Sequence, residues 1–220
     1  VNTTGASNTA LGVHALKSST TASENTAVGY QAAYTTTTGA YNSVFGHKAW
    51  YGGTGTNNSV FGHTAYRDGG AGNNNAAFGY ASMASNTGNH NSAFGNQSVQ
   101  NNTSGQNNTG LGSYALFSNT TASNNTAVGY QAGYSNQTGA SNVAIGSGAL
   151  TANTASYNTA VGREALRENT TGASNSAYGL YSLLTNTTGA NNVAVGQSAL
   201  YANTTASNNT AVGYQAGLNT

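Results

Sequence analysis

Two histidines are the residues of this chain whose spacing points most directly to chemistry. His47 and His63 each come directly after a glycine that stands in the same short sequence frame. If those frames form adjacent strands, the two imidazoles lie about 4.8 Å apart, and imidazole is a common ligand of transition metals. In the other frames this position mostly holds Tyr, Ser, Asn, Gln or Arg. That variation favours an exposed ladder of side chains, and we predict no metal site.

The acidic side chains do not form a recognisable catalytic pair. The chain holds four of them, Glu24, Asp68, Glu164 and Glu168. The last two stand beside Arg163 and Arg167, which indicates an exposed charge-paired patch, whereas a glycosidase needs two carboxylates across a groove. The Ser and Thr residues belong to repeats without a matching His and acid, and no Gly-Lys-Ser/Thr sequence marks a phosphate loop. We therefore predict a protein that is not an enzyme, with no catalytic, cofactor-binding or metal-binding residues.

A glycine that returns every 16 or 17 residues organises the whole chain. These repeat glycines are Gly12, Gly29, Gly46, Gly62, Gly79, Gly95, Gly112, Gly129, Gly146, Gly162, Gly179, Gly196 and Gly213. A strict period of this length marks one short unit stacked on its neighbours. The sequence predicts an all-β, parallel β-solenoid of about 13 coils with 16–17 residues each, running as one array over residues 1–220.

Three further positions are constant in character relative to the repeat glycine, and a fourth is usually large. Asparagine stands four residues before it, and a large apolar or aromatic residue stands one before it. Ala or Ser stands three residues after it, usually followed by another large residue such as Leu150 or Leu166. We expect these columns to form the core. A solenoid needs a polar cap at each end, and no change of composition near Val1 or Thr220 indicates one. We therefore expect a segment of a longer chain, with capping of the ends by other copies as the alternative.

Side-chain alternation along residues 142–146 suggests which positions face inward. Positions 143 and 145 share one face, which we expect to point into the coil, so that four phenylalanines form one buried ladder: Phe45, Phe61, Phe78 and Phe94. Positions 144 and 146 share the other face and would form a flat strip of Ala and Gly. We expect this strip, which includes Ala127, Gly129, Ala160 and Gly162, to approach another chain or the opposing wall closely.

Composition narrows the range of partners. Only 4% of residues are charged, the net charge is +1, and there is no Cys or Pro. Such a chain offers no basic surface to nucleic acid, and without a run of about 18 apolar residues it does not insert into a membrane. Its first residues lack the pattern of a signal peptide. Because so thin a core buries little apolar surface per ordered residue, we expect self-association, with a monomer as the alternative.

Threonine columns suggest a rival function. Threonine recurs eight residues after most repeat glycines: Thr20, Thr37, Thr54, Thr87, Thr103, Thr120, Thr154, Thr170, Thr187 and Thr204. A flat, regular array of hydroxyl and methyl groups could order water, as ice-binding solenoids do. Gly70 and Gln137 interrupt the column, which also falls in the turn-rich half of the coil. Ice binding is therefore the alternative rather than the main expectation.

The repeat frame resembles a known family of surface proteins. Residues 42–46 read Asn-Ser-Val-Phe-Gly and residues 142–146 read Asn-Val-Ala-Ile-Gly, which is similar to the head repeats of YadA-like trimeric autotransporter adhesins. Residues 125–132 and 209–216 read Asn-Thr-Ala-Val-Gly-Tyr-Gln-Ala, which is similar to repeats of phage tail-fibre-like proteins. The resemblance implies a left-handed β-roll, a homotrimer of chains side by side and a role in attachment.

These observations lead to one functional expectation. The chain is a non-enzymatic extracellular fibre segment, an adhesin head or tail-fibre-like shaft at a cell surface or on a virion, that attaches through many weak contacts along its length. The expected partners are the chain itself, as a homotrimer or an end-to-end filament, and a host-surface protein or glycan. No cofactor is expected. A purely structural, self-assembling filament is the further alternative.

Overall fold

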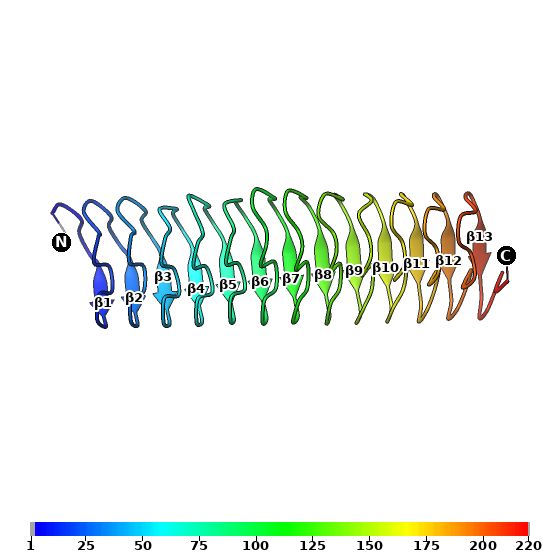
Figure 1. The fold of residues 1–220 in the computed structure, drawn as a ribbon, viewed down its shortest axis with the longest axis horizontal. Helices are drawn as coiled ribbons and strands as arrows, with labels where there is room; N and C mark the ends of the chain where they lie inside the picture. Colours follow the sequence, from blue (N-terminus) through cyan, green and yellow to red (C-terminus); the bar gives the residue numbers. More distant parts are fainter. Residues whose placement is uncertain (1–2, 220) are drawn as a thin grey trace.

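The computed structural model describes residues 3–219 as a single parallel β-solenoid without helices (Figure 1). Thirteen strands of three residues stand side by side along the rod. They are β1 (Thr9–Leu11), β2 (Thr26–Val28), β3 (Ser43–Phe45), β4 (Ser59–Phe61), β5 (Ala76–Phe78), β6 (Ser92–Phe94), β7 (Thr109–Leu111), β8 (Thr126–Val128), β9 (Val143–Ile145), β10 (Thr159–Val161), β11 (Ser176–Tyr178), β12 (Val193–Val195) and β13 (Thr210–Val212). The predicted fold class is therefore confirmed.

Each strand pairs in parallel with the strands of the coils before and after it, in chain order. Thr159 in β10 lies opposite Ser176 in β11, a full coil later. The shorter coils keep the same register, since Ser43 lies opposite Ser59. Backbone hydrogen bonds between coils continue outside the strands, as from Leu183 N–H to the Ala199 carbonyl at 3.0 Å. Proline, which lacks the N–H, would interrupt this ladder, and the chain contains none.

The strands point their central residue into the coil, which is the reverse of the orientation that we expected from the sequence. Ala27, Ala127 and Ala160 are fully buried, whereas the residues on either side of each are partly exposed. At the equivalent Gly110, an added Cβ would lie 2.6 Å from Val99 Cγ2. The opposing wall lies close, and the strand contributes only a small side chain, which is Ala in most coils, Gly at Gly110 and a fully buried Val at Val44 and Val60. The Ala strip faces this wall and not another chain.

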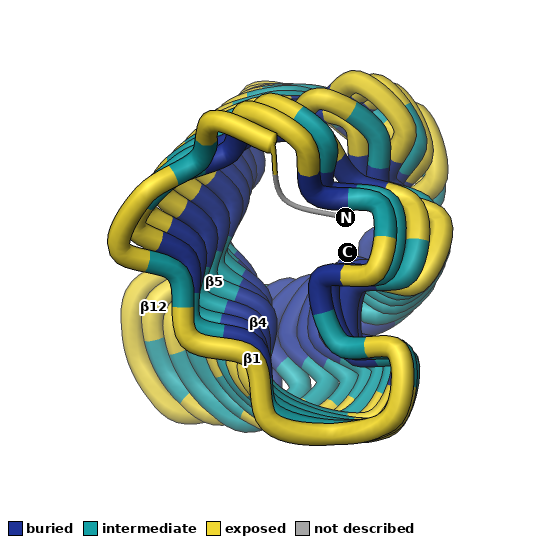
Figure 2. The backbone as a smooth tube through the Cα atoms, turned by 90° about the vertical axis from the view of Figure 1, so that its left-hand side faces the viewer, coloured by how far each residue is buried: buried dark blue, intermediate teal, exposed yellow. Residues whose placement is uncertain are grey.

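The large residue four positions after the repeat glycine fills the interior, as predicted. Leu116, Leu150, Leu166, Leu183 and Leu200 are all buried. Trp50 and Tyr66 occupy the same column in two coils and are fully buried as well. Figure 2, which looks along the rod, shows buried positions lining the interior coil after coil and exposed positions on the outside. The core is thus one column with a large side chain in most coils, interrupted at Ala33 and Gly133.

The repeat glycine is required by backbone geometry and by the closeness of the next coil. Gly112 has a φ of 134°, a region that residues with a Cβ rarely adopt. A Cβ there would lie 2.6 Å from the carbonyl oxygen of Gly129 in the following coil. The close backbone approach expected at the Gly column therefore exists, but it joins coils of the same chain.

The asparagine four residues before each glycine links successive coils. The Asn125 backbone N–H donates to the Asn108 side-chain oxygen at 3.0 Å, and the Asn108 amide donates to the Ala122 carbonyl at 2.8 Å. Asn108 and its counterparts are buried through most of the rod. Each side chain thus supplies the hydrogen bonds that the backbone needs where it turns into a strand. We call this column the asparagine ladder.

A second buried asparagine column follows seven residues after the repeat glycine in the later coils: Asn86, Asn102, Asn119, Asn136, Asn153, Asn169, Asn186 and Asn203. Several neighbours are linked directly, as Asn186 Nδ2 is to Asn169 Oδ1 at 2.8 Å. In two earlier coils the position holds Gly53 and Gly69, where a Cβ would overlap the rings of Trp50 and Tyr66. Each large ring therefore takes the space that asparagine occupies elsewhere.

Candidate functional site: an apolar stripe and an aromatic edge

The surface of the described residues is without pockets, and residues 3–219 contain no group of three or more His, Cys, Asp or Glu side chains placed to hold a metal. Within the same residues there is no helix of the length and apolar character that crossing a bilayer requires. The features that stand out are rows of like side chains that run the length of the rod. Each row repeats one position of the coil.

One row is formed by the large residue at the end of each strand. The predicted phenylalanine ladder is present, since the Phe45, Phe61, Phe78 and Phe94 rings stack with centroids 4.7 Å apart. Its predicted burial is wrong. Phe94 is 38% exposed, and Leu111 and Ile145 in the same row are 47% and 39% exposed. The reason is the strand orientation described above, which sends the end residue outward when the central alanine faces the narrow interior.

We name this row the apolar stripe. Its members are Leu11, Val28, Phe45, Phe61, Phe78, Phe94, Leu111, Val128, Ile145, Val161, Tyr178, Val195 and Val212, all of which are partly or largely exposed. On the same side of the strands runs a row of Thr, Ser, Ala and Val, one position after the asparagine ladder. The stripe presents to the outside the kind of side chains that a globular protein places in its core.

Two further rows form what we name the aromatic edge, beside the turn that follows each repeat glycine. In the first row His47 stacks on Tyr30 and His63 on Tyr80, with ring centroids 5.2 and 5.5 Å apart. The predicted neighbourhood of His47 and His63 is confirmed, because their rings are 4.8 Å apart and nearly parallel. In the second row, five residues after the repeat glycine, Tyr34 stacks on Tyr51 at 4.9 Å. A similar cluster recurs further along the rod at Tyr114, Phe117, Tyr130 and Tyr134.

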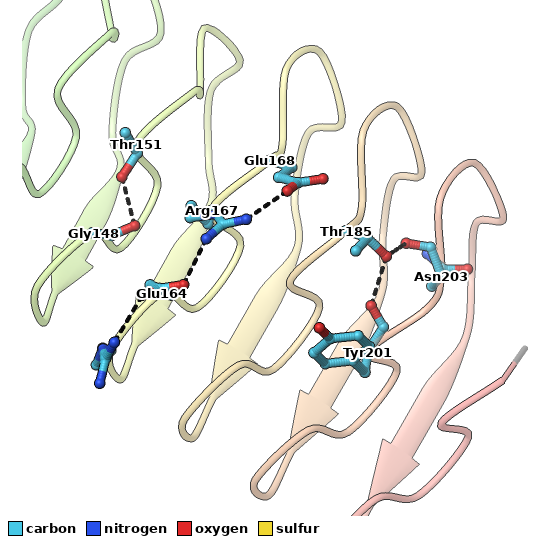
Figure 3. A network of polar contacts seen from close by, with 9 residues as sticks. Gly148, Thr151, Glu164, Arg167, Glu168, Thr185, Tyr201 and Asn203 are labelled. Carbon is cyan, nitrogen blue, oxygen red and sulfur yellow. Dashed lines mark hydrogen bonds and ion pairs between the residues drawn. The ribbon is translucent and has the colours of Figure 1, made fainter.

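The acidic patch is paired, as the sequence indicated (Figure 3). Arg167 lies 2.7 Å from a carboxylate oxygen of Glu164 and 2.7 Å from one of Glu168, and Arg163 lies 3.3 Å from Glu164. The hydrogen bond from Arg167 to Glu168 raises the pKa of the Arg167 guanidinium above its ordinary value. The two carboxylates therefore share one arginine on the surface, and they do not face each other across a groove.

The hydroxyl groups of the threonine column form hydrogen bonds between coils of the rod. Thr120 Oγ1 donates to the Gln137 carbonyl at 3.1 Å, and Thr170 Oγ1 donates to the Thr187 carbonyl at 3.0 Å. An exposed hydroxyl that bonds to the next coil is directed along the rod by that bond. The asparagines of the Asn-Thr-Thr sequences at 119–121, 169–171, 186–188 and 203–205, which match the acceptor sequence for N-glycosylation, are fully buried in the second asparagine column.

Sequence reasoning missed the role of both asparagine columns and the exposure of the apolar stripe. The signal for the asparagine ladder was available in the sequence, because asparagine stands four residues before every repeat glycine. A buried polar residue that never varies along a repeat array needs a hydrogen-bonding reason. The stripe carried no such signal, since strand alternation alone does not say which face is inside.

The fold and these surface rows define a β-solenoid repeat protein. A scan against protein-family models, a search of the curated proteins and a search of the solved structures each returned no match to this chain.

Proposed function

We propose that this chain is a non-enzymatic segment of an extracellular fibre, in which several parallel copies bundle through the apolar stripe and display repeated outer surfaces for attachment. The observation that carries the proposal is the stripe itself. It runs over every coil from Leu11 to Val212 without interruption by a charged residue. A structure evolved as an isolated rod has no reason to keep this one column apolar in all of its coils.

The size of the stripe supports association. Thirteen rungs spaced about 4.8 Å apart, each about 10 Å wide, form a face on the order of 600 Å². That area lies at the upper end of the largest apolar patches that soluble monomers leave exposed. Two copies that meet along it would bury an area in the range of specific interfaces, roughly 1,200 Å² in total.

A three-chain bundle suits this geometry and is the arrangement that the YadA-like resemblance implies. Three straight rods can place their stripes around a common axis, and a cyclic arrangement closes without leaving a stripe exposed. The remaining surface is rich in Asn, Ser, Thr and Tyr and poor in charge. Such a bundle would be stiff and soluble, and each outer row would occur in several copies, so that weak contacts to a surface protein or glycan add up.

Sedimentation equilibrium tests the bundle. We expect the parent to sediment with the mass of a trimer, and the Phe61→Glu/Phe78→Glu variant to sediment as a monomer, because a charge cannot be buried in the stripe without a partner. Thr121→Glu, at an exposed position in the turn-rich half of the coil, is the matched control and should leave the mass unchanged.

Two outcomes separate the proposal from its alternatives. A parent that stays monomeric at high concentration, or a stripe variant that still associates, would overturn the bundle. Continuous filaments seen by negative-stain microscopy, with no binding to cells or glycans, would favour a purely structural filament over an attachment fibre.

A further inference from the structure

The apolar stripe has a neighbouring row whose side chains vary together with it. This row, which we name the flanking row, is formed by the first residue of each strand, whereas the stripe is formed by the last. First and last residues of a three-residue strand share one face, and both are partly or largely exposed in every coil. The members of the flanking row are Thr9, Thr26, Ser43, Ser59, Ala76, Ser92, Thr109, Thr126, Val143, Thr159, Ser176, Val193 and Thr210.

The sizes of the two residues are complementary in all thirteen strands. Five strands end in an aromatic residue, and each of them begins with Ser or Ala: β3, β4, β5, β6 and β11. Each of the other eight strands ends in Val, Leu or Ile and begins with Thr or Val. A very large outward side chain therefore always stands beside a very small one, and a side chain of middle size stands beside another of middle size.

Such compensation has a physical reason only where the face is covered. A side chain that borders water can project further without meeting another atom, so a large neighbour places no limit on it. Where two surfaces meet at the packing density of a protein interior, an added methyl group causes strain and a missing one leaves a void. The size pairing therefore indicates a partner that fits this face coil by coil.

The phenylalanine block shows how closely such a partner must be aligned. Neighbouring rings have centroids 4.7 Å apart and planes within 8° of parallel. This spacing equals the separation of about 4.8 Å between neighbouring strands, so each ring lies across the rod at the height of its own coil. In the same four coils the flanking row has its smallest side chains, which are Ser43, Ser59, Ala76 and Ser92.

A second copy of the chain matches this profile in one alignment. Around any axis parallel to the rod, the stripe of one copy meets the flanking row of the next, so aromatic residues oppose Ser or Ala when equal coils stand at equal height. A shift by one coil would oppose Phe94 to Thr109 and Tyr178 to Val193. Antiparallel rods related by a two-fold axis along the strand direction would instead oppose stripe to stripe, and hence large residues to large ones.

We propose that the apolar stripe packs against the flanking row of an identical copy, coil for coil, and that the size pairing fixes the register and selects identical chains. The proposal deepens the bundle proposed above and rests on it, and it holds for two copies as well as for three. A solenoid with the same repeat frame, but with its aromatic residues in other coils, would meet both overlaps and voids along this face. Each of these weakens its association with this chain.

Strand β11 allows the pairing to be tested by exchange, because its aromatic residue stands alone between aliphatic coils. Tyr178→Val leaves a void and Ser176→Thr adds a methyl group, and each should raise the dissociation constant of the bundle about fivefold or more. The double variant has the pair of the preceding coil, Thr159 and Val161, so the fold accommodates it. In sedimentation equilibrium over a series of concentrations, its dissociation constant should lie within about twofold of that of the parent.

The Phe61→Glu/Phe78→Glu background is the matched control, since we expect it to be monomeric. There the two β11 substitutions should change the melting temperature additively, because the pairing acts between chains. Compensation that persists in this monomer would place the pairing within one chain and overturn the inference.

Disulfide cross-linking measures the register directly, since the chain contains no cysteine. Thr159→Cys and Val161→Cys chains, refolded together and oxidised, should give a mixed covalent dimer that peptide mass mapping identifies. Val193→Cys with Val161→Cys is the control pair. These positions are two coils apart, about 9.6 Å along the rod, which exceeds the Cα separation of about 7 Å that a disulfide allows.

The outcomes separate this inference from the bundle itself. A parent that remains monomeric overturns both. A parent that associates overturns only the coil-for-coil pairing if its double variant is as weak as the single variants, or if the control cysteine pair cross-links as readily as the matched one.

Discussion

The side-chain oxygen of Asn142 accepts a hydrogen bond from the backbone N–H of Asn158, one coil later, at 2.9 Å. The side-chain oxygen of Asn158 in turn accepts a hydrogen bond from the backbone N–H of Asn175 at 2.9 Å. The side-chain amide of Asn158 donates to the Gly172 carbonyl, also at 2.9 Å. A single side chain therefore holds two successive coils in register at the point where the chain enters the strand. Because Asn158 is fully buried, water cannot replace these bonds.

Replacing Asn158 by Ala should lower the free energy of unfolding by about 2 kcal/mol, because the Asn175 N–H would be left buried without a partner and the Gly172 carbonyl would keep only its hydrogen bond from the Asn169 amide. Chemical denaturation followed by circular dichroism measures the change. Asn96→Ala, at an exposed position, is the control and should cost less than about 0.5 kcal/mol. Equal effects of the two substitutions would show that the ladder does not stabilise the rod.

Trp50 and Gly53 should behave as a coupled pair. Gly53→Asn places a side chain where the indole lies, and Trp50→Leu leaves a cavity that costs about 3 kcal/mol. The double variant recreates the Leu150 and Asn153 combination found in a later coil, in which both residues are buried. We expect it to be more stable than the sum of the single effects predicts, by at least about 1 kcal/mol in a double-mutant cycle. Additive effects would mean that the two positions are independent.

Ala160 and Val161 distinguish the two faces of a strand. Ala160→Leu should lower the free energy of unfolding by about 1–3 kcal/mol, because the added atoms meet the opposing wall of the coil. Val161→Leu adds volume on the outward side and should change it by less than about 0.5 kcal/mol. Thermal unfolding at one fixed protein concentration gives the comparison. An Ala160→Leu protein that melts with the parent would contradict the inward orientation of the strand centre.

Tyr157 should be replaceable with a gain in stability. It has a φ of 65° and is 66% exposed, so its side chain gains little from burial while its backbone is in the left-handed region. Asparagine tolerates that region better, and Tyr157→Asn should raise the free energy of unfolding by about 0.5–1 kcal/mol. Tyr130→Asn, at an exposed tyrosine whose φ is not positive, should bring no gain. Identical shifts in melting temperature for both would refute the backbone argument.

Ice binding should be absent. The Thr120 and Thr170 hydroxyls donate to the next coil, and Gly70 and Gln137 interrupt the column. Nanolitre osmometry of the parent should therefore give no thermal hysteresis. Hysteresis in the parent that disappears in Thr120→Tyr and Thr170→Tyr would reverse this ranking and make the threonine column the functional surface.

The regular spacing of the repeat glycine determined most of the architecture. Because a coil of 16 or 17 residues can only stack on its neighbours, the period alone predicted a parallel β-solenoid, its single array and its strand positions. The column that holds Leu116, Leu150 and Leu166 predicted the core correctly. The constant Asn column and the pairing of Arg167 with its glutamates were visible in the sequence as well.

Only the tertiary structure decided which face of each strand is inside. Alternation places Ala160 and Val161 on opposite faces of the strand. The usual preference for burying the larger residue predicts that Val161 points inward, whereas the structure buries Ala160. The interior is largely filled by the column of large residues that includes Leu116, Leu150 and Leu166 and is bounded by the asparagine columns. The strand centre therefore has room only for a small side chain, alanine in most coils and valine at Val44 and Val60, and the larger residue at the strand end turns outward. The size of side chain that fits at the strand centre depends on the distance to the opposing wall of the coil. The spacing of residues along the chain gives no information about that distance.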